Sequence, residues 1–258
     1  MSLIKKEKSV SQYILKSYYG RIFFEFLVHK NPSDTILVLE GFPSEAEHKK
    51  QIEFLYDQGY NVFWPHYPGT YQSEGEFLDK NPVLELSDFI DELKKGEAIN
   101  LWDMSKINFK TNKLFLFGSS FSGAICGGLA NKRKFDGIVL FSPLWDFSDH
   151  HKEGNEQDLN HLVLFVKRAY KHLFRFKWDS LSKKIKEFPE CDSREYIQGL
   201  NSPLLVLHDP QDKTTSIIHT IKIKKSLPKM KLLRHRMGHG MGKVLFQKWG
   251  KIEEFLRG

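Results

Sequence analysis

The chain alternates between short apolar runs and longer segments whose apolar residues recur at helical spacing. Four of these runs are continuous, namely "TILVLE" (35–40), "KLFLF" (113–117), "GIVLF" (137–141) and "PLLVLH" (203–208). Continuous apolar runs of this length are typical of strands that are covered on both faces. Because helical patterns separate most of them, the sequence predicts βα units and a mainly parallel sheet.

The beginning of the chain has a different pattern. The stretch "SQYILKSYYGRIFFEFLV" (11–28) predicts two strands joined by a turn at Tyr19-Gly20, which gives the sheet an antiparallel start. A further short strand is predicted at "NVFW" (61–64).

Two helix starts are marked by capping signals. Ser44 with Glu47 three residues later forms a capping box, which predicts a helix from about residue 45 to residue 58. Asn81 is a good N-cap and Pro82 a good first helical residue, so a second helix is predicted there.

About sixty residues separate the predicted strands 137–141 and 203–208, which is too long for an ordinary crossover. Apolar residues in this gap recur at helical spacing at Leu159, Leu162, Val163, Val166, Ala169, Tyr170 and Leu173, and again at Leu181, Ile185 and Phe188. We therefore expect a helical insertion over about Leu144 to Leu200. The chain then predicts a helix that ends near Leu227, a strand "KMKLLRH" (229–235) and a final helix.

Composition places the chain among ordinary globular proteins. It has 258 residues, of which 40% are hydrophobic and 28% charged, so a single α/β domain is expected. Cys126 and Cys191 are too few for a disulfide framework and indicate a reducing compartment. No run approaches the roughly 18 apolar residues of a membrane span. A cytoplasmic protein with no membrane span is predicted.

The net charge is +7 and unevenly distributed, because eleven Lys or Arg and no acid lie between Asp212 and Glu253. A basic surface can bind nucleic acid, but no helix-turn-helix, zinc finger or aromatic RNA-binding motif accompanies it. We predict a solvated basic face and no nucleic-acid partner. The triplet "DHH" (149–151) lacks a partner at ligand spacing, and no phosphate-binding loop occurs, so neither a metal nor a cofactor is predicted.

The stretch "KLFLFGSSFSGAICGG" (113–128) carries the first chemical signal. It reads as a strand, a turn of small residues and a helix, which is the context of a nucleophile elbow. Ser120 is the preferred nucleophile because Gly118 and Ser122 supply the small flanking residues that the turn needs. Ser119 would place Phe117 at such a position, and Ser122 lies too far beyond the strand.

An acid and a base follow later strands. Asp212 lies in "HDPQDKTT" after the strand 203–208, with Asp209 and Asp146 as alternatives. His239 lies between two glycines after the last predicted strand, with His235 as the alternative. A carboxylate that holds an imidazole beside a serine hydroxyl is the arrangement of a serine hydrolase.

The order Ser120, Asp212, His239 resembles that of the α/β-hydrolase superfamily. The loops "LEGFPSE", "HYPGTYQSEGEF" and "NSPLLVLHDPQD" are also similar to loops of this superfamily. The stretch "PGTYQSEGEF" and the turn "GSSFSG" resemble those of the small hydrolases related to prolyl oligopeptidase and acylaminoacyl peptidases. The resemblance implies one domain over residues 1–258, with a mostly parallel eight-stranded sheet flanked by helices and a helical cap at about 144–200. It also implies an oxyanion hole made by the backbone N–H groups of Phe42 and Phe121.

The resemblance implies a serine hydrolase that cleaves carboxylic esters of small or medium acyl groups through an acyl-enzyme. Its partner is then a small-molecule ester or amide. A peptidase or amidase and a non-catalytic binding protein of the same fold are the alternatives. One departure is Glu40, which precedes Gly41 where many relatives have histidine, and its role is left open.

Overall fold

A central sheet of eight strands organises the computed structural model, which describes residues 13–45, 48–146, 158–192 and 197–258. In spatial order the strands are β1 (Leu15–Tyr19), β2 (Ile22–Leu27), β4 (Asn61–Pro65), β3 (Ser33–Leu39), β7 (Thr111–Ser119), β8 (Gly137–Phe141), β9 (Leu204–His208) and β10 (Lys231–Arg234). Strands β1 and β2 are antiparallel to their neighbours, and the other six run parallel. The predicted mostly parallel, eight-stranded sheet is confirmed.

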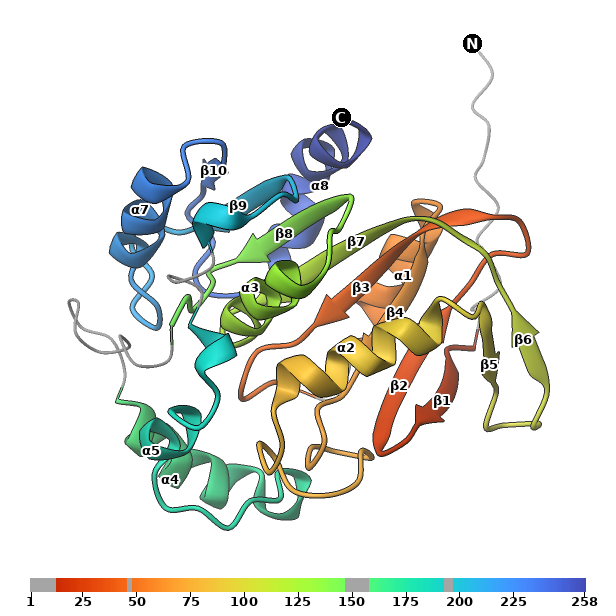
Figure 1. Ribbon diagram of the computed structural model, residues 1–258, viewed down its shortest axis with the longest axis horizontal. Helices are drawn as coiled ribbons and strands as arrows, with labels where there is room; N and C mark the ends of the chain where they lie inside the picture. The colour runs from red at the N-terminus through yellow and green to blue at the C-terminus, as the bar shows by residue number, and fades with distance from the viewer. Residues whose placement is uncertain (1–12, 46–47, 147–157, 193–196) are drawn as a thin grey trace.

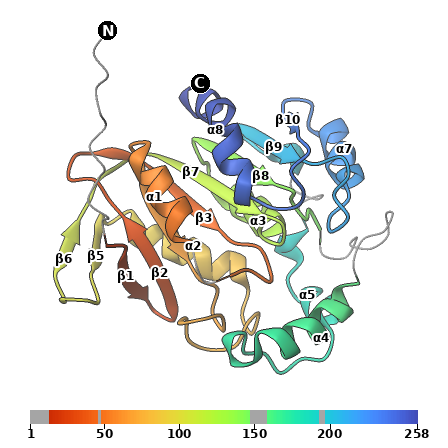
Figure 2. The same cartoon turned by 180° about the vertical axis from the view of Figure 1, so that it is seen from behind.

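Helices cover both faces of this sheet (Figure 1). Helices α2 (Pro82–Leu93) and α3 (Ser122–Lys132) lie on one face, and α1 (Lys49–Asp57) and α8 (Gly242–Arg257) lie on the other (Figure 2). Helix α7 (Ile217–Ser226) lies near the β10 edge.

The continuous apolar strands supply both layers of the core. In β3, Leu37 and Leu39 pack into the core under α2 and α3, whereas Ile36 and Val38 pack into the core under α1 and α8. Successive side chains of a strand point to opposite faces, so a strand buried on both sides must be apolar at every position. This explains why the runs lack the alternation of a half-exposed strand.

The predicted helix at 45–58 begins later than expected. Helix α1 starts at Lys49, and its N-cap His48 makes no side-chain capping bond. Ser44 does not cap this helix, since its hydroxyl is buried without a hydrogen-bond partner among the described residues. Glu47, the other half of the predicted capping box, lies outside the described residues. In α2, by contrast, the Asn81 side chain accepts hydrogen bonds from the first turn as predicted.

A small second sheet was not predicted. Strands β5 (Glu97–Ile99) and β6 (Lys106–Asn108) pair antiparallel between α2 and β7. Each has only three residues, and β5 alternates exposed, buried and exposed positions. Such short strands give almost no periodic signal in the sequence.

The described part of the long segment between β8 and β9 contains several short helices joined by irregular stretches. It contains α4 (Leu159–Ala169), α5 (Leu181–Ile185) and 3-10 turns at Lys171–Leu173, Pro189–Cys191 and Ile197–Gly199. Helices α4 and α5 lie together at one end of the molecule (Figure 1). The first predicted amphipathic stretch is α4 followed by a 3-10 turn, and the second is helical only as far as Ile185, so Phe188 lies outside it. No helix among the described residues is long and apolar enough to cross a membrane.

The parallel strands direct several loops to one place. The carboxyl ends of parallel strands share one edge of a sheet, and α/β proteins bind ligands along that edge. The loops after β3, β7, β9 and β10 meet here, and they carry Glu40, Ser120, Asp212 and His239.

Candidate active site

Ser120 lies in the turn between β7 and α3, in the left-handed region of backbone conformation with φ +53°. This region is uncommon for a residue with a side chain and is strained. Hydrogen bonds from both sides hold the turn. The Ser120 N–H donates to the Phe141 carbonyl at 3.0 Å, and the Ser120 carbonyl accepts from Leu144 N–H at 2.9 Å. The end of β8 and the loop that follows it therefore fix the strained residue.

Glycines allow this turn to pass close to its neighbours. A Cβ on Gly118 would lie 2.5 Å from Cys126 Sγ, and a Cβ on Gly123 would lie 2.5 Å from Pro143 Cβ. Both distances are shorter than real Cβ contacts, so any larger residue would push the turn away from its neighbours. Burial raises the pKa of the Cys126 thiol, which is a packing group here and not a reactive thiolate.

The two alternative serines make structural contacts. The Ser122 hydroxyl accepts from Ser119 N–H at 2.6 Å and is placed to donate to the Leu39 carbonyl at 2.9 Å, which ties the turn to β3. The Ser119 hydroxyl accepts from Met241 N–H at 3.1 Å, which ties β7 to the start of α8. Both serines therefore brace the turn that carries Ser120.

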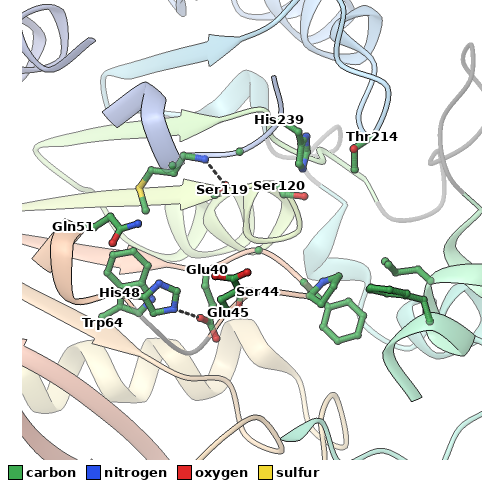
Figure 3. A pocket seen from close by; sticks show the side chains of 18 of the residues that line it. Glu40, Ser44, Glu45, His48, Gln51, Trp64, Ser119, Ser120, Thr214 and His239 are labelled. Atoms are coloured by element: carbon green, nitrogen blue, oxygen red, sulfur yellow. Dashed lines mark hydrogen bonds and ion pairs between the residues drawn. The ribbon is translucent and has the colours of Figure 1, made fainter. Parts of the chain in front are cut away.

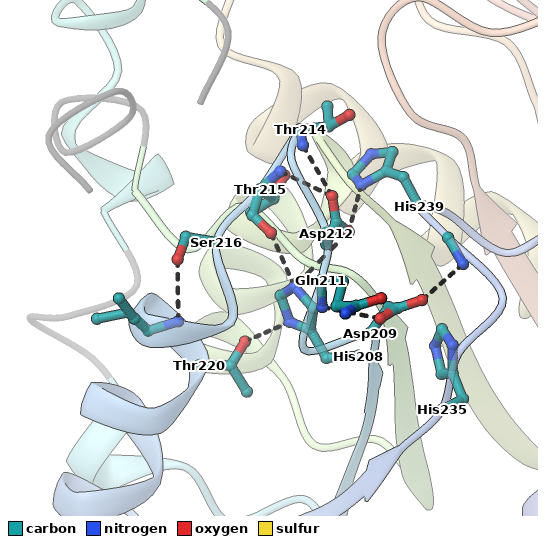
Figure 4. Close-up of polar contacts among 12 residues, drawn as sticks. His208, Asp209, Gln211, Asp212, Thr214, Thr215, Ser216, Thr220, His235 and His239 are labelled. Carbon is teal, nitrogen blue, oxygen red and sulfur yellow. Dashed lines mark hydrogen bonds and ion pairs between the residues drawn. The ribbon is translucent and has the colours of Figure 1, made fainter. Parts of the chain in front are cut away.

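Asp212 and His239 are directly connected, as Figure 4 shows. The distance between His239 Nδ1 and Asp212 Oδ2 is 2.7 Å. The other carboxylate oxygen accepts from Thr214 N–H at 2.9 Å and Thr215 N–H at 3.1 Å. Burial by itself would raise the pKa of Asp212, but the hydrogen bond and charge of His239, together with the Thr215 N–H and the Ser142 side chain, lower the pKa to about 2. An ionised Asp212 thus fixes the His239 ring.

The alternative acid and base residues have other partners. Asp209 accepts from Gln211 N–H and from Gly238 N–H, each at 2.8 Å, so it holds the histidine loop. Asp146 forms an isolated bridge with Asp192 in the segment before β9. His235 is buried and its Nδ1 accepts from Met237 N–H at 3.3 Å.

A buried histidine that the sequence analysis did not single out supports the acid loop. His208 Nε2 donates to the Thr215 carbonyl at 2.9 Å, and its Nδ1 lies 2.8 Å from the Thr220 hydroxyl. Trp145 Nε1 donates to the same hydroxyl at 2.9 Å, so Thr220 is left to donate to the ring. Burial lowers the pKa of His208, in agreement with a neutral ring. Such a network gives no periodic signal in a sequence.

Ser120 and His239 line one cavity of about 720 Å³ (Figure 3). Its described lining residues are Glu40, Gly41, Phe42, Pro43, Ser44, Glu45, His48, Gln51, Trp64, Ser119, Ser120, Asp158, His161, Leu162, Phe165, Thr214, His239, Gly240, Met241 and Gly242. No hydrogen bond joins Ser120 to His239 in the described part of the chain, although both face this cavity. Helix α4 contributes Leu162 and Phe165, which the sequence predicted only as part of an insertion.

The residues predicted for the oxyanion hole belong to the loop after β3 and the turn after β7. Phe42 follows Gly41, and a Cβ built on Gly41 would lie 3.3 Å from Ser120 Cβ. The Phe42 N–H donates no backbone hydrogen bond to any described residue. Phe121 directly follows Ser120 and is the N-cap of α3. The structure thus brings both backbone segments to the serine.

A second carboxylate and imidazole pair lines the same cavity. Glu40 Oε2 accepts from His48 Nε2 at 2.9 Å, and the His48 ring stacks on Trp64 with centroids 4.1 Å apart. Glu40 is only 3% exposed, and its Oε1 accepts no hydrogen bond from a described residue. His66 Nδ1 is 3.7 Å from that oxygen. The sequence analysis noted Glu40 but assigned it no role, and it did not single out His48.

No group of three or more His, Cys, Asp or Glu residues in the described ranges is arranged to hold a metal ion. The triplet 149–151, considered and set aside in the sequence, lies outside these ranges.

Comparisons with known proteins identify the fold. No family model matches the sequence, and no curated protein matches it. A Paleococcus ferrophilus monoacylglycerol lipase is similar in structure, with TM-score 0.64, 16% identity, and coverage of 92% of this chain and 98% of the lipase. A Pyrococcus furiosus esterase gives TM-score 0.62, 18% identity, and coverage of 95% and 91%. A Pyrococcus horikoshii acylaminoacyl peptidase gives TM-score 0.65 and 11% identity, with coverage of 95% of this chain and 40% of the peptidase.

These structures share the α/β-hydrolase fold, which confirms the fold that the sequence resemblance predicted. Identities of 11 to 18% carry the fold and not the activity.

Proposed function

We propose that the protein is a serine hydrolase that cleaves carboxylic esters of small or medium acyl groups, with Ser120 as nucleophile, His239 as base and Asp212 as its orienting acid. The observation that carries the proposal is the 2.7 Å bond between His239 and Asp212 at the cavity that Ser120 lines. An aspartate with a purely structural role does not require a histidine that faces the same cavity as a strained serine.

The proposed chemistry follows from these positions. His239 Nδ1–H donates to Asp212, which leaves the Nε2 lone pair to take the Ser120 proton. The serine oxygen attacks the ester carbonyl, and the negative oxygen that forms is stabilised by the N–H groups of Phe42 and Phe121. Protonated His239 returns the proton to the departing alcohol, which leaves an acyl-enzyme. Water, deprotonated by His239, then releases the acid.

The cavity supports an ester with an apolar part. Phe42, Pro43, Leu162 and Phe165 give it an apolar side, and Phe165 is 53% exposed at the same time. A cavity of about 720 Å³ falls in the range of small-molecule sites. These features favour a small or medium acyl chain that packs against Leu162 and Phe165 of α4.

The test is turnover of p-nitrophenyl acetate, butyrate and octanoate by the purified protein. We expect measurable kcat/KM for all three. Absence of turnover, together with absence of labelling by a fluorophosphonate, would favour a non-catalytic binding protein. The similarity to an acylaminoacyl peptidase keeps amide cleavage as the second candidate. Faster cleavage of aminoacyl p-nitroanilides than of the esters would favour it.

A further inference from the structure

Helix α4 exposes large apolar side chains on its outer face. Val163 and Val166 are fully buried and form the inner face of the helix, whereas Leu164 is 52% exposed and Phe165 is 53% exposed. Both views of the molecule place α4 at one end, away from the sheet (Figure 1, Figure 2). The outer face of an amphipathic helix normally carries polar residues, so these two side chains call for an apolar partner.

The segment that contains α4 and the turn after it is basic. Between positions 159 and 178 the sequence has five Lys or Arg and neither Asp nor Glu. Three of the five have partners within the protein, since Lys167 and Lys177 form ion pairs and Arg175 donates to backbone carbonyls. Arg168 and Lys171 are exposed and form no ion pair with a described acid. The charge that this segment presents to solvent is therefore positive.

These two cations lie beside the exposed apolar residues. Arg168 follows Leu164 by four positions, which places both side chains on the same side of the helix. Lys171 begins the 3-10 turn that ends at Leu173, which is 40% exposed. Asp158, the N-cap of α4, lies at the opposite end of the helix. We call the following residues the α4 surface: Leu164, Phe165, Arg168, Lys171 and Leu173.

The α4 surface is continuous with the candidate cavity. Phe165 lines the cavity together with Leu162, Ser120 and His239, and it is half exposed to solvent at the same time. One apolar wall therefore extends from the proposed nucleophile to the outside of the molecule. An apolar molecule bound at the outer face could reach the cavity along this wall.

The composition of the α4 surface favours a lipid partner over a protein or a nucleic acid. A stable protein interface buries about 800 Å² on each partner, which is more than one face of an 11-residue helix provides. A nucleic acid binds cations and makes no use of Leu164 or Phe165. A helix face with apolar residues beside cations binds anionic lipid, because the apolar side chains enter the acyl region and the cations contact the headgroups.

We propose that the α4 surface docks the protein on an anionic lipid surface, with the cavity opening toward the lipid. The anionic headgroups complement Arg168 and Lys171, and the acyl region accepts Leu164, Phe165 and Leu173. This inference goes beyond the proposed ester hydrolysis, since docking needs no reaction. It gives the exposed apolar side chains of α4 a partner.

A fluorescent probe on α4 tests the docking directly. Cys126 and Cys191 are each 1% exposed, so a cysteine introduced by Leu164→Cys can be labelled selectively with nitrobenzoxadiazole. Vesicles of equal parts phosphatidylglycerol and phosphatidylcholine should shift its emission to the blue, and phosphatidylcholine vesicles should not. The same probe at Ile218→Cys is the control, because Ile218 is 41% exposed on the basic helix α7. Its emission should not change.

Cosedimentation with the same anionic vesicles measures each part of the α4 surface. Leu164→Gln should weaken binding about fivefold, because about half of this side chain remains to be buried. Arg168→Gln combined with Lys171→Gln should weaken it about 25-fold. Lys225→Gln combined with Lys229→Gln removes the same charge elsewhere and should change binding less than about twofold.

Controls separate lipid docking from loss of the fold or of the site. Circular dichroism checks that each variant is folded. Without vesicles, kcat/KM for dissolved p-nitrophenyl acetate should be the same in Leu164→Gln as in the wild-type protein, because Leu164 does not line the described cavity. High salt should weaken binding to the anionic vesicles, since it screens exposed charges.

The outcomes that would overturn the inference are distinct. Absence of binding to anionic vesicles, or a probe shift at position 218 and not at 164, would refute docking through α4. A dimer in analytical ultracentrifugation that Leu164→Gln dissociates would assign the α4 surface to a second copy of the chain and would also overturn it. Vesicle binding by a protein that hydrolyses no ester would leave the inference standing and refute only the proposed function.

Discussion

Asp209 and Asp212 lie three residues apart in one loop but have different partners. Asp212 accepts from the His239 ring and from two backbone N–H groups of its own loop. Asp209 accepts from backbone N–H groups, including that of Gly238, which precedes His239. The structure therefore predicts that one aspartate orients the base and the other positions its loop.

Replacing each aspartate by asparagine separates these roles. Asp212→Asn removes the charge that holds the His239 ring and its tautomer, so kcat for p-nitrophenyl butyrate should fall about 10⁴-fold. Asp209→Asn keeps an acceptor oxygen for the loop and should cost far less. Circular dichroism of both variants is the control. Equal losses would show that the acid is wrongly assigned.

His208 makes stability depend on pH. Burial lowers the pKa of both His208 and His235 in the folded protein. Below their ordinary value of about 6.5 the unfolded chain therefore binds protons that the folded chain does not. The contribution of these two histidines to the free energy of unfolding is therefore fully present above that pH. It falls as the pH decreases, by up to about 1.4 kcal/mol per pH unit for each histidine.

Urea unfolding between pH 7 and pH 5 measures this effect. The free energy of unfolding should decrease over this range in the wild-type protein. His208→Gln should make the decrease shallower by up to one proton, whatever its stability at pH 7. The same slope in both proteins would contradict a neutral, buried His208.

At the residue scale the sequence predicts Ser120, Asp212 and His239 because each follows a recognisable strand in a loop with small or turn-forming residues. The contacts of Glu40 with His48, and of His208 with Thr220, join residues whose spacing carries no periodic signal. They depend on how loops pack after folding, and a single sequence does not reveal that packing.

Among the elements, the turn between β7 and α3 is the most constrained. Gly118 and Gly123 have no room for a side chain, and Ser120 has a positive φ. The neighbours of Gly123 are Pro143 and the Leu144 carbonyl, which belong to the loop after β8. The backbone of Pro143 and Leu144 cannot move aside easily, so the turn depends on glycine at position 123.

Two glycine replacements make a matched pair. Gly123→Ala would place its Cβ 2.7 Å from the Leu144 carbonyl oxygen, and it should lower the free energy of unfolding by about 1–3 kcal/mol and reduce activity. Gly250→Ala lies within α8, where a Cβ meets nothing within 4 Å, and it should raise stability by about 0.5–1 kcal/mol. Thermal unfolding measures both. A neutral Gly123→Ala would contradict the close approach.

The elements predicted best are those with strong patterns. The continuous apolar runs became central strands, and the Asn81-Pro82 signal became the start of α2. The predicted start of α1 was wrong, because Ser44 does not cap this helix. Its backbone carbonyl accepts from the Tyr71 hydroxyl, a contact across 27 positions that local capping rules do not include.

At the scale of the whole molecule, the segment after β8 is fastened to the loop after β4. Thr70 and Phe174 form an isolated bridge, Arg175 N–H donates to the Gly69 carbonyl at 2.8 Å, and Phe77 N–H donates to the Arg175 carbonyl. These contacts hold the segment that begins with α4 at the cavity. The sequence predicted a helical insertion, but the attachment joins loops about a hundred residues apart and is visible only in the fold.

The sheet brings residues that are far apart in the chain, from Glu40 to Gly242, to one cavity. The central claim is that Ser120 is a nucleophile there. The most direct test is to treat the protein with a fluorophosphonate and to locate the label by fragmentation of the peptide 114–132, which contains Ser119, Ser120 and Ser122. We predict one label, on Ser120, which is lost in Ser120→Ala and strongly slowed in His239→Ala. A label on Ser119 or Ser122, or ester hydrolysis that continues unchanged in Ser120→Ala, would contradict the claim.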